Sequence, residues 1–389
     1  MKSNYEPLGK HIQLVDYRNS EEVTSTVLGI SIDKEFMPSV ANVIGTDLSR
    51  YKLISKGLFA CNPMHVGRDE RLPIALYEKD SPAIVSPAYF MFEIIDRDVL
   101  NEEYLMMWFR RPEFDRECWF MTDGSVRGGI TWDDLCRIKL PVPSYARQCE
   151  IVESYRAITD RIALKRAEND NLEATAQAVF QEQFASFYGA DELPDGYRII
   201  NLDNLCTVKG GKRLPADCKL LDTPTDHPYI RVRDVGSNRY VCLTNQFQYI
   251  DEETYSAISR YIVNTGDIVI SIVGTIGLLG KIHSSLDKAN LTENCVKLAN
   301  IHTVTSDYLY YTLCYKKQIK EIDLLTVGAV QAKLPMYNIQ SMKILVPPTK
   351  AIEAFQRKMN VLNEQIEANT VEIQKLYELE EVLLAKLSD

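Results

Sequence analysis

The chain has 389 residues, with 44 lysines and arginines against 54 aspartates and glutamates, and a formal charge of -10. A hydrophobic content of 46% excludes wholesale disorder, and apolar runs such as Ile268–Val273 are far shorter than the ~20 residues of a membrane helix. No secretory signal is expected, and nine cysteines without a Cys-x-x-Cys pair favour a reducing cytoplasm over a disulfide framework or zinc site. The length suggests two domains or more, and the acidic balance argues, on its face, against a nucleic-acid partner.

Residues 1–145 have the pattern of a small α+β domain. A helix is predicted over Asn101–Arg110. The predicted strands are Val27–Ile32, Leu58–Cys61, Ala83–Ser86, Tyr89–Ile95 and Arg137–Val142.

Residues 146–187 are predicted to form one long helix. Apolar residues recur at spacings of four and three, which is the a/d pattern of a coiled coil, and no proline or glycine interrupts them. Lys165 and Asn169 are polar interruptions of this seam. Its main apolar members are Ile151, Ile158, Ile162 and Leu172.

Residues 188–349 begin with a Gly-, Pro- and acid-rich linker, residues 188–197, and continue as a second α+β domain. A helix is predicted over Ser306–Tyr315. The predicted strands are Pro228–Arg233, Asp267–Val273, Leu278–His283 and Cys295–Ala299.

Residues 350–389 are predicted to form a second long helix with the same pattern and one polar position, Asn369. Forty residues of helix span roughly 60 Å. The two seams favour pairing of the helices with each other, although each helix could instead pack only on its own globular domain. The apolar seam consists of Phe355, Leu362, Ile366, Ile373 and Leu376.

The two halves of the chain are related by an internal repeat with an offset of 204 residues. Thr122–Val126 matches Thr326–Val330, and Lys139–Pro143 matches Lys343–Pro347. The same offset superposes the two helical seams, so we interpret the chain as two copies of one domain-plus-helix unit.

Catalytic motifs are lacking. The sequence has no G-x-G-x-x-G loop and no G-x-S-x-G elbow, and its five histidines are scattered without metal-ligand spacing. Gly274–Ile282 has the wrong spacing for a phosphate-binding loop and is better explained as a hairpin with glycine turns. Asp217-Cys-Lys219 alone is weak support for a nuclease site. The sequence therefore favours a binding or scaffolding protein without a metal site.

Cations gather in predicted loops of both halves, although residues 1–145 are acidic overall and residues 188–349 are neutral. Arg231 and Arg233 alternate on a predicted strand and should project from one face. Arginine reads guanine, glutamine reads adenine and lysine binds phosphate, so these positions are candidate DNA contacts. The candidates are His65, Arg68, Arg71, Arg127, Lys209, Lys212, Arg213, Arg231, Arg233, Gln331 and Lys333.

Several segments carry a family resemblance that spans the whole chain. They include PYIRVRD (228–234), GDIVISIVGTIG (266–277), TENCVKL (292–298) and VGRDERLPIAL (66–76). With these segments the chain resembles the DNA-specificity subunit of a type I restriction-modification system.

The resemblance implies an α+β fold with two target-recognition domains alternating with two long helices, which pair as an antiparallel coiled coil in a pseudo-twofold tandem repeat. It also implies that the chain performs no chemistry, binds double-stranded DNA, and docks two methyltransferase subunits and the restriction subunits. S-adenosylmethionine, ATP and Mg²⁺ would be bound by those partners. The implied domains are residues 1–145 and 188–349, with spacer helices at 146–187 and 350–389.

Two alternatives stay open from the sequence. The chain could be a specificity module for a system whose methylase and nuclease share one polypeptide. It could also be a coiled-coil scaffold without a role on DNA. Two unequal readers in one chain predict an asymmetric split target rather than a palindrome.

Overall fold

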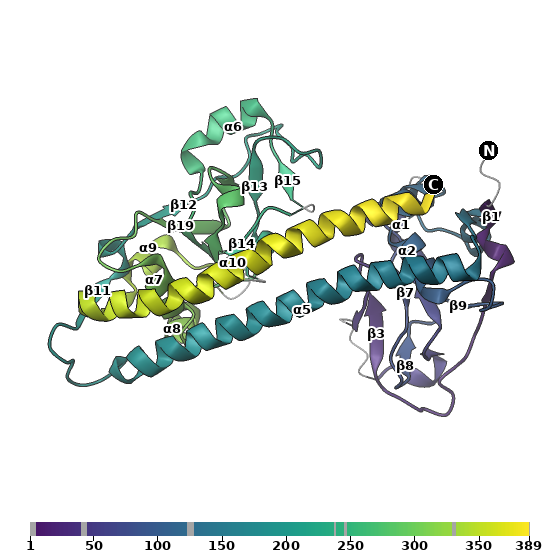
Figure 1. The fold of residues 1–389 in the computed structure, drawn as a ribbon, viewed down its shortest axis with the longest axis horizontal. Coiled ribbons are helices and arrows are strands. Elements are labelled where there is room, and N and C mark those ends of the chain that lie inside the picture. The colour runs from purple at the N-terminus through teal and green to yellow at the C-terminus, as the bar shows by residue number, and fades with distance from the viewer. Residues whose placement is uncertain are drawn as a thin grey trace. The chain divides into compact units, whose positions relative to one another are not determined.

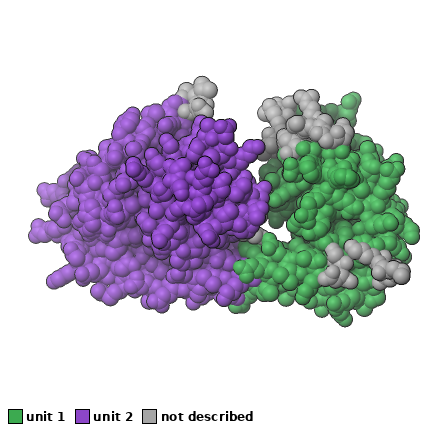
Figure 2. All heavy atoms as spheres, turned by 90° about the horizontal axis from the view of Figure 1, so that it is seen from above, with its two compact units in different colours: residues 1–162, 376–389 green, residues 163–375 purple. Residues whose placement is uncertain are grey.

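The computed structural model describes residues 5–39, 45–122, 128–236, 239–244, 247–328 and 332–388. The chain forms two compact units. Unit 1 comprises residues 1–162 and 376–389, and unit 2 comprises residues 163–375 (Figure 2).

Unit 1 contains two four-stranded sheets and one pair of strands. The first sheet has the order β2 (Ile12–Leu14), β9 (Phe90–Ile94), β6 (Phe59–Cys61), β7 (Ile74–Leu76). The second has the order β4 (Phe36–Pro38), β3 (Val27–Ile30), β8 (Ala83–Val85), β5 (Lys52–Ile54). The pair consists of β1 (Tyr5–Pro7) and β10 (Lys139–Pro141). The short helices are α1 (Val66–Asp69), α2 (Glu102–Phe109), α3 (Pro112–Phe120) and α4 (Trp132–Arg137).

In the described residues, unit 2 repeats this plan with one more strand in the first sheet and one fewer in the second. That sheet has the order β12 (Thr207–Gly210), β19 (Cys295–Ala299), β16 (Ile268–Ser271), β17 (Leu279–Ile282), β14 (Tyr240–Val241). The second has the order β15 (Gln248–Tyr249), β13 (Pro228–Ile230), β18 (Asn290–Leu291). The pair consists of β11 (Arg198–Asn201) and β20 (Lys343–Val346). The short helices are α6 (Glu252–Ile258), α7 (Ser306–Leu313), α8 (Lys316–Leu325) and α9 (Met336–Ser341).

The sequence repeat is a structural repeat. Helix α2 begins at Glu102 and α7 begins at Ser306, which is 204 residues later, and the same offset relates the first residues of α3 and α8 and of α4 and α9. Both members of the first pair are capped by a side chain: Asn101 accepts from the backbone of α2 and Thr305 from that of α7. Each unit is therefore an α+β domain built on the same order of elements.

Two long helices, α5 (Tyr145–Phe184) and α10 (Thr349–Ala385), contribute a segment to each unit (Figure 1). In unit 1 the start of α5 contacts the end of α10, where Tyr155 Oη donates to Glu380 Oε1 at 2.7 Å. Val152 and Tyr155 join Leu384 and Leu387 in the apolar core of that unit. The helices therefore run antiparallel there.

In unit 2 the polar interruptions of the two seams meet one another. Lys165 Nζ donates to Asn369 Oδ1 at 2.9 Å, and Asn369 Nδ2 donates to Asn169 Oδ1 at 2.9 Å. Lys165 also lies 3.6 Å from the Glu372 carboxylate. Asn369 is buried, so sliding one helix along the other would leave its amide without these partners. These contacts set the register of the antiparallel pair within unit 2.

The predicted pairing of the long helices is confirmed, because each helix packs on the other as well as on the sheets and short helices of its unit. Packing on the globular domain alone is thus excluded. All nine predicted seam residues are shielded from solvent: Ile162, Phe355 and Ile366 are buried, and Ile151, Ile158, Leu172, Leu362, Ile373 and Leu376 are partly buried.

Most predicted strands agree with the structure, and Cys295–Ala299 coincides with β19. The prediction for Pro228–Arg233 is wrong beyond Ile230, because Asp234 Oδ2 accepts from the backbone N–H of Arg231 at 2.8 Å and the chain turns into a 3-10 helix, Val232–Asp234. The prediction for Arg137–Val142 is too long, because Arg137 still belongs to α4.

Candidate nucleic-acid interface

Three loops of unit 2 meet at one end of its five-stranded sheet. Strand β19 is antiparallel to both β12 and β16, so the loops that follow β12 and β16 lie beside the segment that precedes β19. We call this region, formed by Gly211–Arg213, Gly274–Gly277 and Thr292–Asn294, the loop end of unit 2. Gly274 and Gly277 both have φ of +82°, which suits the predicted glycine-turn hairpin between β16 and β17.

Gly211 allows the chain after β12 to pass close to the β18–β19 connection. Its N–H donates to Cys295 O at 3.0 Å, and the next residue, Lys212, donates to Leu291 O at 2.8 Å. A Cβ atom at Gly211 would lie 2.0 Å from Thr292 O, so no side chain fits. The position of the two cations Lys212 and Arg213 therefore depends on this glycine.

The cations of this loop are exposed. Arg213 Nε donates to Glu293 Oε1 at 2.7 Å across the loop end. Burial alone would raise the pKa of Glu293, but the hydrogen bonds from Arg213 and its neighbours outweigh burial and lower it. The Lys212 ammonium lies 5.7 Å from the centre of the Tyr261 ring. Lys209, on β12, is exposed as well.

Arg231 and Arg233 do not project from one strand face, because neither lies on a strand. Arg231 is held internally: its guanidinium donates twice to the Asp234 carboxylate, at 2.8 and 2.9 Å, and once to Gln248 Oε1. Its side chain is only 14% exposed, whereas that of Arg233 is 65% exposed. Arg233 is thus the better placed of the two to meet a ligand.

Lys333 also lies at this end of the five-stranded sheet. It forms β-bridges with Val273, just after β16, and with Val327. Its neighbour Leu334 donates to Ile272 O at 3.0 Å. The candidate Gln331 lies outside the described residues.

Lys333 also lines a groove of about 420 Å³ at the loop end of unit 2. The floor is apolar, and Met336 and Tyr337 are exposed at its side. A Cβ atom at Gly210 would meet nothing within 4 Å, so this strand residue leaves the groove open. The lining residues are Gly210, Ile272, Val296, Lys333, Pro335, Met336 and Tyr337. Two of these, Met336 and Tyr337, were not among the site residues predicted from the sequence.

The described candidates of unit 1, His65, Arg68 and Arg71, belong to the segment after β6, at the equivalent end of the first sheet. Ile130 donates to Pro63 O at 3.2 Å, which reproduces the Leu334–Ile272 contact of unit 2. Gly67 donates to Gly128 O at 2.9 Å, so the loop after β6 lies beside the segment that leads into α4. His65 ends a 3-10 helix in this loop and Arg68 lies in α1. The candidate Arg127 is outside the described residues.

Arg71 is exposed at the end of the same loop and lies 3.4 Å from the Asp33 carboxylate. A buried ion pair anchors the loop: Lys34 Nζ lies 2.7 Å from Asp115 Oδ1, which also accepts from the backbone of Leu72 at 3.0 Å. Burial lowers the pKa of Lys34, and the Asp115 carboxylate only partly offsets this. Sequence reasoning missed this pair, because a buried lysine has the same sequence signature as an exposed one.

The two units differ at the position of the groove. Trp132 begins α4, as Met336 begins α9, and its ring packs edge-on against Phe90 at 5.8 Å and tilted against Phe92 at 5.5 Å. In unit 1 three aromatic rings thus pack together at the position where Met336 and Val296 line the groove of unit 2. The two loop ends consequently present different surfaces on the same framework.

A catalytic centre is not evident in the described part of the chain. Those residues contain no cluster of three or more His, Cys, Asp or Glu placed to hold a metal ion. All nine cysteines are free thiols. Asp217 and Lys219, the weak nuclease candidates, are both exposed. Among the described helices, none combines the length and apolar character needed to cross a bilayer.

Comparison with known proteins gives a consistent family. Residues 194–382 match the family model of the type I restriction modification DNA specificity domain. The chain is 22% identical over 314 residues to the type I restriction enzyme MjaIX specificity subunit of Methanocaldococcus jannaschii, covering 76% of this chain and 70% of that protein. It is 21% identical over 326 residues to the HindI specificity subunit of Haemophilus influenzae, covering 66% and 70%.

The solved structure of the S subunit of a type I restriction-modification system from M. genitalium aligns with 98% of this chain and 95% of that chain, at 13% identity and a TM-score of 0.49. The specificity-domain match and the curated relatives point to the same family. Residues 194–382 thus match the type I restriction modification DNA specificity domain, and the chain is similar over most of its length to specificity subunits of type I restriction enzymes.

Proposed function

We propose that the chain reads an asymmetric, two-part DNA target, with one half-site for each unit. The observation that carries this proposal is the repeat of one framework with two different loop ends. In unit 2 the loop end combines Lys212, Arg213 and Lys333 with an open apolar groove. In unit 1 the rings of Phe90 and Trp132 pack together at the equivalent place. Because the loop ends of the two units have different surfaces, they should recognise half-sites of different base sequence.

The formal charge of -10 does not conflict with DNA binding. Residues 350–389 carry 5 basic and 8 acidic residues, whereas residues 188–349 carry 17 of each. Phosphate contacts need only a few placed cations, and the partner subunits can add more. In unit 2 the exposed candidates Lys212, Arg213 and Lys333 lie on loops near one end of the five-stranded sheet, which is where a reader of base edges needs them.

We further propose that α5 and α10 act as the spacer between the two readers and as the docking surface for two methyltransferase subunits, with the restriction subunits completing the complex. In this proposal residues 1–145 and 188–349 are the target-recognition domains, and 146–187 and 350–389 are the spacers. S-adenosylmethionine, ATP and Mg²⁺ are then bound by the partners, and the complex works in the cytoplasm. The size of a copurifying methyltransferase distinguishes separate partner subunits from a fused methylase-nuclease.

Methylome sequencing tests the proposed function directly. Strains with and without the gene are compared for adenine methylation at every sequence motif. We expect one split, non-palindromic motif to be methylated only when the gene is present. The proposal is wrong if no split motif changes, or if the motif that changes is continuous or palindromic.

Lys333→Ala is expected to weaken the DNA binding of the assembled methyltransferase complex. The logarithm of the DNA-binding constant falls as the logarithm of the salt concentration rises, and the variant should make this slope less steep by about one unit. The reason is that each lysine that binds a phosphate releases counterions from the DNA, so the loss of one lysine makes binding less dependent on salt. The binding constant is measured by fluorescence anisotropy across a series of salt concentrations.

Lys316→Ala is the matched control for this measurement. Lys316 is an exposed lysine at the first residue of α8, and its neighbour Lys317 contacts the linker at Tyr188 rather than the loop end. Its removal should leave the salt slope unchanged. An equal effect of both variants, or no effect of Lys333→Ala, would remove Lys333 from the interface.

A further inference from the structure

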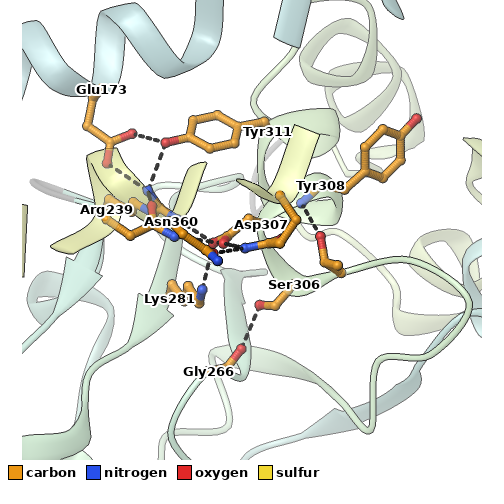
Figure 3. A network of polar contacts seen from close by, with 12 residues as sticks. Glu173, Arg239, Gly266, Lys281, Ser306, Asp307, Tyr308, Tyr311 and Asn360 are labelled. Atoms are coloured by element: carbon orange, nitrogen blue, oxygen red, sulfur yellow. Dashed lines mark hydrogen bonds and ion pairs between the residues drawn. The ribbon is translucent and has the colours of Figure 1, made fainter. Parts of the chain in front are cut away.

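Unit 2 contains a buried group of charged side chains that touches both long helices (Figure 3). Its centre is Arg239, which immediately precedes β14 and is 3% exposed. The guanidinium pairs with Asp307 of α7, donates to Asn363 Oδ1 of α10 at 2.5 Å, and lies 3.7 Å from Glu173 Oε1 of α5. One side chain thus bridges the edge of the sheet to three helices.

Asp307 is the main acceptor of the group. Its carboxylate also accepts from Lys281 Nζ at 2.6 Å, from Gln356 Nε2 at 2.6 Å and from Asn363 Nδ2 at 2.7 Å. Burial alone would raise the pKa of Asp307, but the ion pairs with Lys281 and Arg239 outweigh burial and lower it to about 2. The carboxylate is therefore charged at neutral pH.

Two further contacts complete the attachment. Tyr311 Oη accepts from Arg239 Nη1 at 2.9 Å and donates to Glu173 Oε2 at 2.9 Å. Four residues beyond Arg239, Leu243 O accepts from Gln374 Nε2 of α10 at 2.8 Å. The segment that contains β14 is consequently bound to α5 and to two separate positions along α10.

Unit 1 is attached differently. The residue 204 positions before Asp307 is Glu103, which pairs with Arg156 of α5, but the Arg156 side chain is 57% exposed. The first sheet of unit 1 ends at β7 in the described residues and contains no strand equivalent to β14. Exposed ion pairs contribute little rigidity, whereas a buried charge that loses its partner is strongly unfavourable. The buried ion pairs beside the long helices are thus a property of unit 2, whereas in unit 1 the two long helices are joined through Tyr155, which accepts from Arg110 at 3.1 Å and donates to Glu380.

We propose that Arg239 and Asp307 are positioning residues that hold the second reader in one orientation on α5 and α10, and that they thereby restrict the spacer length of the DNA target. The inference rests on the proposed reading of a two-part target. Any rotation of the reader on the helices would separate buried charges that are paired in only one arrangement. The network therefore penalises every other orientation.

The spacer of the target is a sensitive measure of that orientation. Adding or removing one base pair turns a half-site by roughly 34–36° about the DNA axis and shifts it by roughly 3.4 Å. A reader held by directional bonds cannot follow this change, whereas a reader that can tilt on its helices can. The network should therefore affect which spacers are accepted more than how tightly the correct target is bound.

The test uses the chain assembled with its methyltransferase partner. Methylation rates are measured on duplexes with the native spacer and with spacers one base pair shorter or longer. We expect wild type to prefer the native spacer by about tenfold or more and Arg239→Met to reduce this preference to about threefold or less. The ratio is taken on one protein preparation, so a smaller folded fraction cancels. An unchanged ratio overturns the proposal.

A double variant separates positioning from charge imbalance. Arg239→Met together with Glu173→Gln removes one positive and one negative charge and leaves Lys281 paired with Asp307. We expect the spacer preference to stay lost in the double variant. If it returns to the wild-type ratio, the single variant had acted through an unpaired buried charge, and the positioning role is wrong.

Arg156→Met in unit 1 is the matched control and should keep the wild-type spacer preference. A loss as large as that of Arg239→Met would mean that the buried network of unit 2 has no special role. If wild type itself shows no spacer preference, two-part reading fails and this inference fails with it. If wild type and both Arg239 variants show the same strong preference, only this inference fails.

Discussion

Replacing Phe355 with alanine is expected to lower the free energy of unfolding of unit 2 by about 3–5 kcal/mol. Phe355 is fully buried on α10, where its ring lies 5.6 Å from that of Phe184 and 6.0 Å from that of Phe180, both on α5. It also meets Tyr308 and Tyr311 of α7 edge-on, each at 6.1 Å. Removal of this ring leaves a cavity between both long helices and the domain. Urea unfolding of the full chain, followed by circular dichroism, measures the loss.

Val361→Ala is the control on the same helix. Val361 is 69% exposed, so its truncation should change the free energy of unfolding by no more than about 0.5 kcal/mol. The comparison isolates burial, because both variants shorten an apolar side chain on α10. Equal effects of the two substitutions would mean that α10 does not pack on the core of unit 2 as described.

A methyl group at Gly211 is expected to displace the loop that carries Lys212 and Arg213. The added Cβ atom would lie 2.0 Å from Thr292 O and 2.3 Å from Leu291 O, and these are backbone atoms that cannot rotate away. We expect Gly211→Ala to lower the free energy of unfolding by about 1–3 kcal/mol and to weaken DNA binding by the assembled complex about tenfold or more at fixed salt.

The adjacent glycine provides a matched control for this prediction. A Cβ atom at Gly210 would meet nothing within 4 Å, so Gly210→Ala should leave the free energy of unfolding near wild type. Both substitutions add one methyl group to neighbouring residues, and only their surroundings differ. Equal losses of stability in the two variants would show that the close approach of Gly211 to Thr292 O does not constrain the loop after β12.

The long helices and the repeat were predictable from the sequence because their signals are local and periodic. The alternating spacing of apolar residues identified the seam from Ile151 onward, and the structure buries its members at least partly. The 204-residue offset between Lys139–Pro143 and Lys343–Pro347 indicated the repeat that the start residues of the helices confirm. Strand β19 is a short apolar run with one lysine, Lys297, at its centre, and it was predicted at its observed bounds.

The sequence was a poorer guide to short elements. Strands β5 and β7 have three residues each, which is too few for a period to emerge. Helix α3 begins with Pro112 at its first position, a signal that could have marked its start. Asp234 ended the predicted strand at Ile230 through a side-chain contact to the backbone, and the alternation argument for Arg231 and Arg233 failed with it.

The sequence by itself determined the two-copy architecture and the pairing of the helices, because both depend on residues a fixed number of positions apart. Only the tertiary structure decided which cations can meet a ligand. Lys333, Arg231 and Arg239 have the same sequence signature, yet one is exposed beside a groove, one is held by Asp234 and one is buried among three helices. Their roles depend on hydrogen bonds and ion pairs that can join residues more than a hundred positions apart, and local periodicity contains no information about those contacts.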